Sequence, residues 1–179
     1  MDYDRLISTA LSCGASKAAV LDESDIVTDI AFFDICKKNG CGKFGTCYMC
    51  PPLCGDAGEL MKRVRNYKKG LLYQTISPLE DSFDFEGMAE AGNHFEKVAL
   101  EIKKNLLPYL PEDHWFLTKG GCSLCEKCAC LTNEPCRHPD LATIGMEGAC
   151  IDVYNTCKNT ELKYINGPDT VTYFGLVLF

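Results

Sequence analysis

The 179-residue chain has the composition of a globular protein, with 46% hydrophobic and 24% charged residues, and its length suits a single domain spanning residues 1–179. Its net charge of −7 argues against binding to nucleic acid, which requires a basic surface. No segment approaches the roughly 20 apolar residues of a membrane helix. The N-terminal "MDYDRLISTA" is acidic and amphipathic rather than a secretory signal. We therefore expect a cytoplasmic protein that contacts neither nucleic acid nor membrane.

The thirteen cysteines are the unusual feature of this composition. In a secreted chain they would suggest a disulfide framework. Here their number is odd, and cysteines separated by two residues recur. Such closely spaced thiols are better placed to chelate one ion or cluster than to staple a fold. The composition therefore predicts a metal or iron–sulfur protein.

Helices and strands are predicted to alternate along the chain. In order, they are helix 2–13, strand 17–21, helix 57–67, strand 70–77, helix 86–107, strand 114–118, helix 143–158 and strand 171–179. The helices are predicted from apolar residues at helical spacing, most clearly in 86–107, where Pro108 ends the pattern. Residues 26–35 are expected to be extended. The almost unbroken apolar run in 171–179 predicts a central strand.

This order of elements predicts an α/β or α+β fold. We expect a sheet of about four to five strands packed by helices. The two clusters of cysteines fall between predicted elements, in segments rich in glycine and proline. They should therefore form two cysteine-rich metal-binding loops near the ends of strands.

The second cluster contains three cysteines two residues apart, Cys122, Cys125 and Cys128, followed by Cys136. Three thiolates at this spacing can surround one face of a compact inorganic core, and the fourth completes the ligand set. Bacterial ferredoxins use a similar run for iron–sulfur clusters. Zinc sites more typically pair two C-x2-C knuckles a dozen or more residues apart. The spacing favours a [4Fe–4S] cluster. Cys130 is expected to be a spare thiol rather than an alternative ligand.

The first cluster contains Cys36, Cys41, Cys47, Cys50 and Cys54. Its spacing matches no standard zinc or ferredoxin motif. The cluster therefore predicts a metal site without predicting which metal it holds. Elsewhere, His138 is expected to hydrogen-bond a sulfur or a loop carbonyl rather than to serve as a ligand or proton donor. Glu147 is expected to cap a helix, with a hydrogen bond to a ligand loop as the alternative.

Four segments together resemble a known family: "CGKFGTCYMCPP", "YKKGLLYQ", "GGCSLCEKCACLTNEPCRHP" and "GMEGACIDV". They are similar to a prokaryotic family of predicted metal-binding proteins, domain of unknown function 2284, and the resemblance extends from about Gly14 to the terminal strand. It implies a small cysteine-rich protein of anaerobic bacteria and archaea, and it supplies no reaction.

The resemblance also implies a ligand set. Its pattern maps onto Cys36, Cys41 and Cys50 in the first site and onto Cys122, Cys125, Cys128 and Cys136 in the second. Cys13, Cys47, Cys54, Cys130, Cys150 and Cys157 are then additions in this sequence. The fourth ligand of the first site is left open between Cys54 and Cys47, and the predicted set includes Cys54.

Three functions are compatible with these ligands. The first is electron transfer by two iron–sulfur clusters, in which the acidic surface docks a basic redox partner. The second is an enzyme whose first cluster, held by only three cysteines, keeps one iron open to substrate. The third is a binding module stabilised by zinc. The oligomeric state is left open. The sequence contains no nucleophile elbow, P-loop or H-E-x-x-H motif that would identify a reaction.

Overall fold

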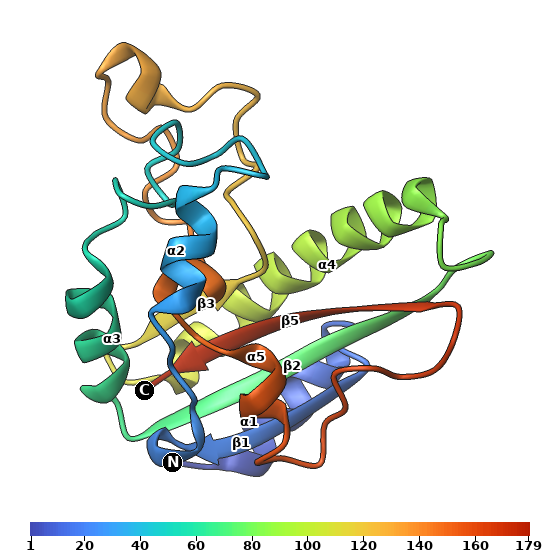
Figure 1. The fold of residues 1–179 in the computed structure, drawn as a ribbon. Coiled ribbons are helices and arrows are strands. Elements are labelled where there is room, and N and C mark those ends of the chain that lie inside the picture. The colour runs from blue at the N-terminus through green and yellow to red at the C-terminus, as the bar shows by residue number, and fades with distance from the viewer.

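The computed structural model describes all residues, 1–179, and contains one five-stranded sheet. Its strands are β1 (Lys17–Asp22), β2 (Lys69–Pro78), β3 (Trp115–Thr118), β4 (Ile144–Gly145) and β5 (Thr170–Leu178). They lie in the order β1-β2-β5-β3-β4, and every neighbouring pair is antiparallel except β3 and β4. Helices pack on both faces (Figure 1). The predicted single sheet packed by helices is confirmed as an α+β fold, and the predicted central strand is β5.

One face of the sheet is covered by α1 (Tyr3–Ser12) and the 22-residue α4 (Phe85–Leu106). Both helices begin at an aspartate whose carboxylate accepts a backbone N–H of the first turn: Asp2 from Arg5 at 3.0 Å and Asp84 from Gly87 at 2.8 Å. Such caps satisfy donors that the helix leaves unpaired. The apolar stripe of α4, which the spacing predicted, packs with α1 against alternate residues of the strands.

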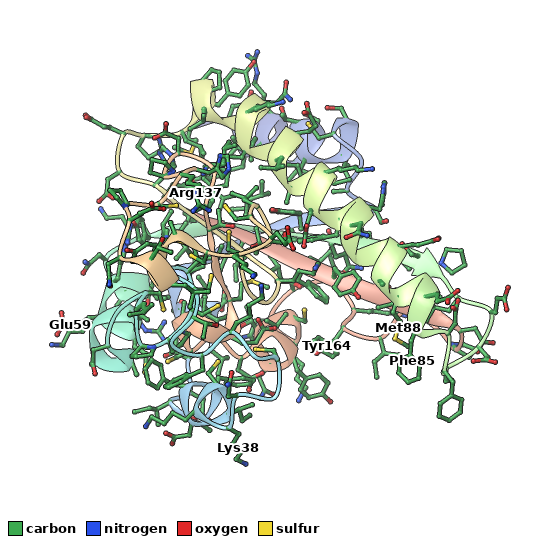
Figure 2. All side chains as sticks on the ribbon, turned by 90° about the horizontal axis from the view of Figure 1, so that it is seen from above. Lys38, Glu59, Phe85, Met88, Arg137 and Tyr164 are labelled. Atoms are coloured by element: carbon green, nitrogen blue, oxygen red, sulfur yellow. The ribbon has the colours of Figure 1, made fainter.

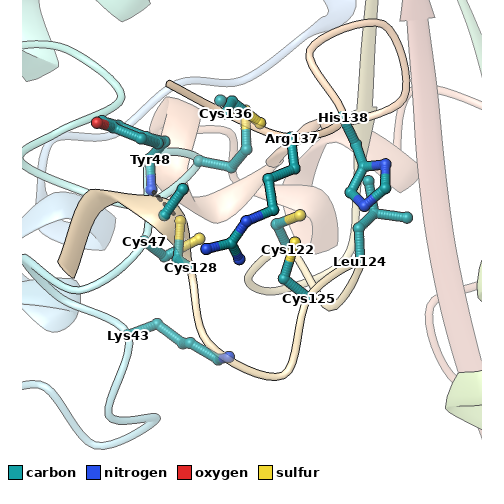
Figure 3. Close-up of a pocket in the computed structure, with 12 residues that line it drawn as sticks. Lys43, Cys47, Tyr48, Cys122, Leu124, Cys125, Cys128, Cys136, Arg137 and His138 are labelled. Carbon is teal, nitrogen blue, oxygen red and sulfur yellow. Dashed lines mark hydrogen bonds between the residues drawn. The ribbon is translucent and has the colours of Figure 1, made fainter. Parts of the chain in front are cut away.

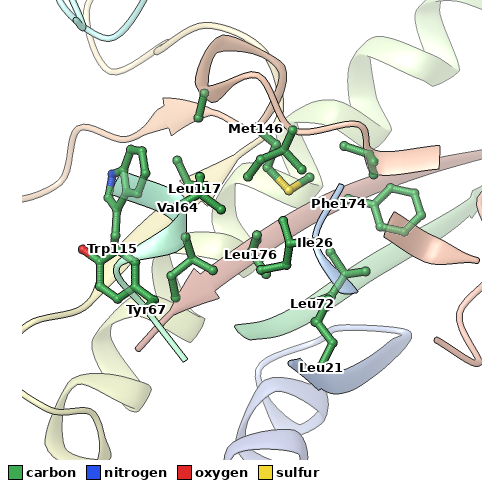
Figure 4. Packing of buried hydrophobic residues seen from close by; sticks show 14 of the residues in the cluster. Leu21, Ile26, Val64, Tyr67, Leu72, Trp115, Leu117, Met146, Phe174 and Leu176 are labelled. Atoms are coloured by element: carbon green, nitrogen blue, oxygen red, sulfur yellow. The ribbon is translucent and has the colours of Figure 1, made fainter. Parts of the chain in front are cut away.

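The opposite face carries α3 (Ala57–Arg65), α5 (Val153–Cys157) and the segments that approach the cysteine loops. Figure 4 shows the core beneath them, where Val64 and Met146 meet Leu117 and Leu176 of the sheet. Trp115 is 7% exposed, and the guanidinium carbon of Arg63 lies 4.1 Å from its ring centroid. The packing on this face therefore holds α3 and the segment after β4, which flank the cysteine loops, against the sheet.

Two predicted elements are wrong. Residues 26–35 are not extended throughout, because α2 (Ala31–Lys37) begins within them and carries Cys36 in its last turn. Only Thr28 forms an isolated bridge, with Ile151. The helix is stabilised by a tertiary contact, because Phe33 is buried against Ala57 and packs α2 on the N-terminal end of α3.

Residues 143–158 do not form one helix. They divide into β4, the 3-10 helix η4 (Glu147–Ala149) and α5. Ile144 and Gly145 pair with β3, and Cys150 then takes a positive φ of 63°, which interrupts a helix. The apolar spacing in this segment reflects burial on one face rather than helical continuity.

The arrangement places both cysteine loops at one end of the molecule. Figure 2 shows Arg137, in the loop between β3 and β4, well away from Phe85 and Met88 at the start of α4.

None of the helices combines the length and apolar character that a membrane crossing requires.

Candidate metal centre

Two loops of different origin meet above the carboxyl ends of the parallel strands β3 and β4. The first loop (residues 38–56) connects α2 to α3, and the second loop (residues 119–143) connects β3 to β4. They are drawn in cyan and in gold to orange in Figure 1, where they lie beside each other. Tyr48 joins them, since its backbone N–H donates to Cys128 Sγ at 3.5 Å and its hydroxyl donates to the Glu134 carbonyl at 2.9 Å.

The first loop is shaped by local backbone features that the sequence supplies. Asn39 takes a positive φ of 54°, a conformation that asparagine tolerates, and its side-chain oxygen accepts the backbone N–H of Phe44 at 3.0 Å. Gly45, with a φ of 70°, donates to the Pro51 carbonyl at 2.9 Å. These bonds fold residues 39–51 back on themselves, so that the cysteines within them face the second loop.

The second loop starts and ends at a close approach of two backbones. A Cβ on Gly145 would lie 2.2 Å from the carbonyl oxygen of Gly120, so only glycine fits there. The same junction is closed by the Met146 N–H, which donates to the Thr118 carbonyl at 2.7 Å. The loop therefore leaves and re-enters the sheet at adjacent points, which brings Glu147 close to Gly120.

The second cavity contains the predicted cysteine quartet and one more cysteine. Figure 3 shows Cys122, Cys125, Cys128 and Cys136 around it together with Cys47 of the first loop. The space between them is about 20 Å³, which suffices for one water molecule. A cluster is larger, so its binding would require the two loops to separate. Cys130 does not line the cavity.

Cys47 is the member of this cavity that sequence reasoning placed elsewhere. It is 3% exposed, and its sulfur lies between the thiols of Cys122 and Cys50. The hydrogen bonds that Cys122 and Cys50 donate to it lower the pKa of Cys47 and raise those of the two donors. Cys47 lies 75 residues before Cys122, yet it shares a cavity with the cysteines of the second loop. The spacing of cysteines along the sequence does not predict this contact.

Backbone N–H groups favour the thiolate form of Cys128 in the second cavity. For Cys128, burial raises the pKa, but the backbone N–H groups of Cys130 and Tyr48 outweigh it, and the net shift is downward. Arg137 donates to the Lys127 carbonyl at 3.1 Å and also reaches Cys125. N–H donors to the Cys128 sulfur favour metal ligation there, because the thiolate is the ligand. His138 also lines the cavity, but its ring forms no hydrogen bond, so the expected bond to sulfur or a loop carbonyl is absent.

The first cavity lies next to the second and is larger, at about 100 Å³. Its polar side chains are Cys36, Cys41, Cys50 and Glu147. The rest of its lining is apolar or glycine, namely Phe44, Met49, Pro51, Gly120, Gly121, Gly145 and Gly148. Met49 also lines the second cavity, so the two spaces share a wall.

The two residues considered as fourth ligand of the first site do not line the first cavity. Cys47 lines the second cavity, and Cys54 is half-buried and packs against the main core. Burial raises the pKa of the Cys54 thiol to about 11. The structure thus groups the three cysteines implied by the family resemblance around the first cavity and leaves Cys54 outside its lining.

Glu147 is the fourth polar side chain that lines the first cavity, beside Cys36, Cys41 and Cys50. It is the first residue of η4, whose N-cap is Met146, so the expected capping role is wrong. The alternative, a hydrogen bond to a ligand loop, agrees with the bond that its carboxyl accepts from the Gly120 N–H of the second loop. Burial raises the pKa of its carboxyl, while its own backbone N–H and that of Gly120 partly oppose the shift. Sequence reasoning undervalued Glu147, whose only signal was its position in "GMEGAC" after the second loop.

No three histidine, cysteine, aspartate or glutamate side chains converge as the ligands of a single metal ion. The donors instead surround two adjacent spaces, and all thirteen cysteines are free of disulfides. The chemistry of the second cavity is that of a soft site: its lining contains five thiols and no carboxylate. Such thiol sets suit zinc, copper(I) and iron–sulfur clusters.

The comparisons with known proteins agree with this chemistry. No curated protein and no solved structure matches the chain. A family described as predicted metal-binding proteins, domain of unknown function 2284, matches residues 19–179, which include both loops and every strand except the first two residues of β1. The chain therefore belongs to this family of predicted metal-binding proteins.

Proposed function

We propose that this protein binds two iron–sulfur clusters, most simply two [4Fe–4S] centres, and acts in electron transfer. The observation that carries the proposal is the second cavity, where five cysteines from two loops surround one space. Thiolates alone select soft metals. The ferredoxin-like run of Cys122, Cys125 and Cys128 favours an iron–sulfur cluster among them.

The residues of each cavity have distinct roles in this proposal. Cys122, Cys125, Cys128 and Cys136 would hold the second centre, with Cys47 as an additional thiol at its inner side. Cys36, Cys41 and Cys50 would hold the first centre. When bound, a cluster supplies one-electron transfer.

The surroundings of the sulfurs would adjust the reduction potential. The Tyr48 N–H points at Cys128 Sγ, and Arg137 reaches Cys125. Donors and positive charge at cluster sulfurs stabilise the more negative, reduced state. Met49 and the half-buried Leu124 exclude water from one side of the second cavity.

The closeness of the two cavities supports a path for electrons between the centres. Cys47 and Cys50 are three residues apart and share a sulfur–sulfur hydrogen bond, yet each lines a different cavity. Electrons could therefore pass between centres through a short covalent segment. The net charge of −7 would steer a basic redox partner toward the protein.

The test is a metal analysis of protein purified without oxygen. Iron, acid-labile sulfide and zinc are measured per chain, and the visible spectrum is recorded before and after dithionite. We expect about eight irons and about eight sulfides, with bleaching on reduction. Zinc without sulfide or colour would refute the proposal and favour a zinc-stabilised fold.

A pair of cysteine variants then separates the two centres. Cys125→Ala should remove about four irons and leave the absorbance of the first centre. Cys13→Ala is the matched control, because Cys13 follows α1 on the opposite face of the sheet and lines neither cavity. Equal iron loss in both variants would mean that the loss reflects unfolding rather than ligand removal.

A further inference from the structure

The first cavity has three thiols and one carboxylate as its only polar side chains. Both cysteines considered as its fourth donor lie outside its lining. The remaining polar side chain of the lining is Glu147, which follows the end of β4, whereas the three thiols come from α2 and the first loop. Three sulfurs from the first loop and α2 and one oxygen from the β4 side therefore enclose the space.

The carboxylate of Glu147 has backbone N–H groups as partners, its own and that of Gly120, but no partner of opposite charge. No lysine or arginine forms an ion pair with it. It is half-buried among apolar side chains and glycines. A carboxylate in such surroundings is costly unless a cation compensates it. A metal centre in the cavity would supply that positive charge.

The glycines around Glu147 leave the space open. Gly120, Gly121, Gly145 and Gly148 all line the first cavity. At Gly121 a Cβ would lie 3.0 Å from Cys50 Sγ, so a side chain there would press on a proposed ligand. The backbone is thus kept clear on the side from which Glu147 approaches.

We propose that Glu147 is the fourth donor to the centre held by Cys36, Cys41 and Cys50. This inference rests on the proposed metal-binding function and deepens it. Carboxylate oxygen is a harder donor than thiolate and a poorer match to a soft centre. The first centre would therefore be the one at which a small oxygen or nitrogen donor can displace a protein ligand, while the all-cysteine second centre only carries electrons.

The experiment compares four proteins purified without oxygen: wild type, Glu147→Gln, Glu147→Cys and Glu126→Gln. The last is the matched control, because Glu126 is an exposed glutamate of the second loop that lines neither cavity. Iron, sulfide and zinc are measured per chain. Electron paramagnetic resonance after mild oxidation reports three-iron clusters, which form when a cubane loses the iron that lacks a firm ligand.

If Glu147 is the fourth donor, Glu147→Gln should lose about one of the four irons of the first centre and show the three-iron signal. Glu147→Cys should restore the iron and suppress that signal, and Glu126→Gln should equal wild type. Iron content and spectra of Glu147→Gln equal to those of wild type would overturn the inference and leave the proposed function standing.

Other outcomes distinguish the two proposals. Wild type that contains zinc and no sulfide refutes the iron–sulfur function. In that case a lower zinc content in Glu147→Gln than in Glu126→Gln still supports Glu147 as a donor, and equal zinc contents overturn it. Wild type without any bound metal refutes both.

Discussion

The junction of Gly145 with Gly120 offers the sharpest test of how the sheet positions the cysteine loops. In Gly145→Ala the new Cβ would lie 2.2 Å from the Gly120 carbonyl oxygen, whereas real Cβ contacts below 3.0 Å are essentially never seen. The two backbones would have to separate by about 0.8 Å at a hydrogen-bonded strand end. The obstacle is backbone rather than a flexible side chain, so we expect a loss of about 1–3 kcal/mol in the free energy of unfolding.

Gly148→Ala is the control for this substitution. Its Cβ would lie 3.4 Å from Ile144 Cγ2 and 3.7 Å from Pro51 Cδ, which are ordinary contacts. Unfolding in urea is followed by circular dichroism under anaerobic, reducing conditions, and the two variants are compared at equal denaturant slope. Gly145→Ala should also retain less metal in the first centre, because the clash displaces Gly120 in the wall of that cavity, whereas Gly148→Ala meets only ordinary contacts there. A Gly145→Ala protein as stable as Gly148→Ala would refute the argument that this close approach holds the loop ends together.

Three further predictions concern single side chains. Cys47→Ser should lower the metal content of the second centre, because Cys47 hydrogen-bonds Cys122, a proposed ligand of that centre, whereas Cys130→Ser should leave the metal content unchanged. Equal metal contents in the two variants would contradict a role of Cys47 at this centre. Tyr48→Phe removes the hydroxyl bond between the loops and should cost about 0.5–1.5 kcal/mol in urea unfolding, while Tyr164→Phe, whose hydroxyl has no partner, should cost less. Burial raises the pKa of Cys157 to about 11, so the unfolded chain loses this proton first, and the free energy of unfolding should fall as pH rises from about 9 to about 11, by roughly 2 kcal/mol from this thiol. Cys157→Ala should show a shallower decline over the same pH range, and an unchanged slope would assign the pH dependence to other groups.

The sequence by itself determined much of the framework. Strands 17–21, 70–77, 114–118 and 171–179 and the long helix 86–107 were predicted within two residues of their observed ends, because their apolar periodicity is local and strong. The grouping of Cys122, Cys125, Cys128 and Cys136 also follows from local spacing, since neighbours so close along a chain can hardly avoid sharing one space.

Only the tertiary structure decided which distant residues share a cavity. Cys47 and Cys50 are near neighbours in sequence, yet each lines a different cavity, and the half-buried Cys54 packs against the main core instead. Glu147 reaches the first cavity because β4 pairs in parallel with β3, which brings its carboxyl end beside Gly120. Such placements depend on strand pairing and loop packing between segments many residues apart. They cannot be predicted from the periodicity of apolar residues, which reports only local structure.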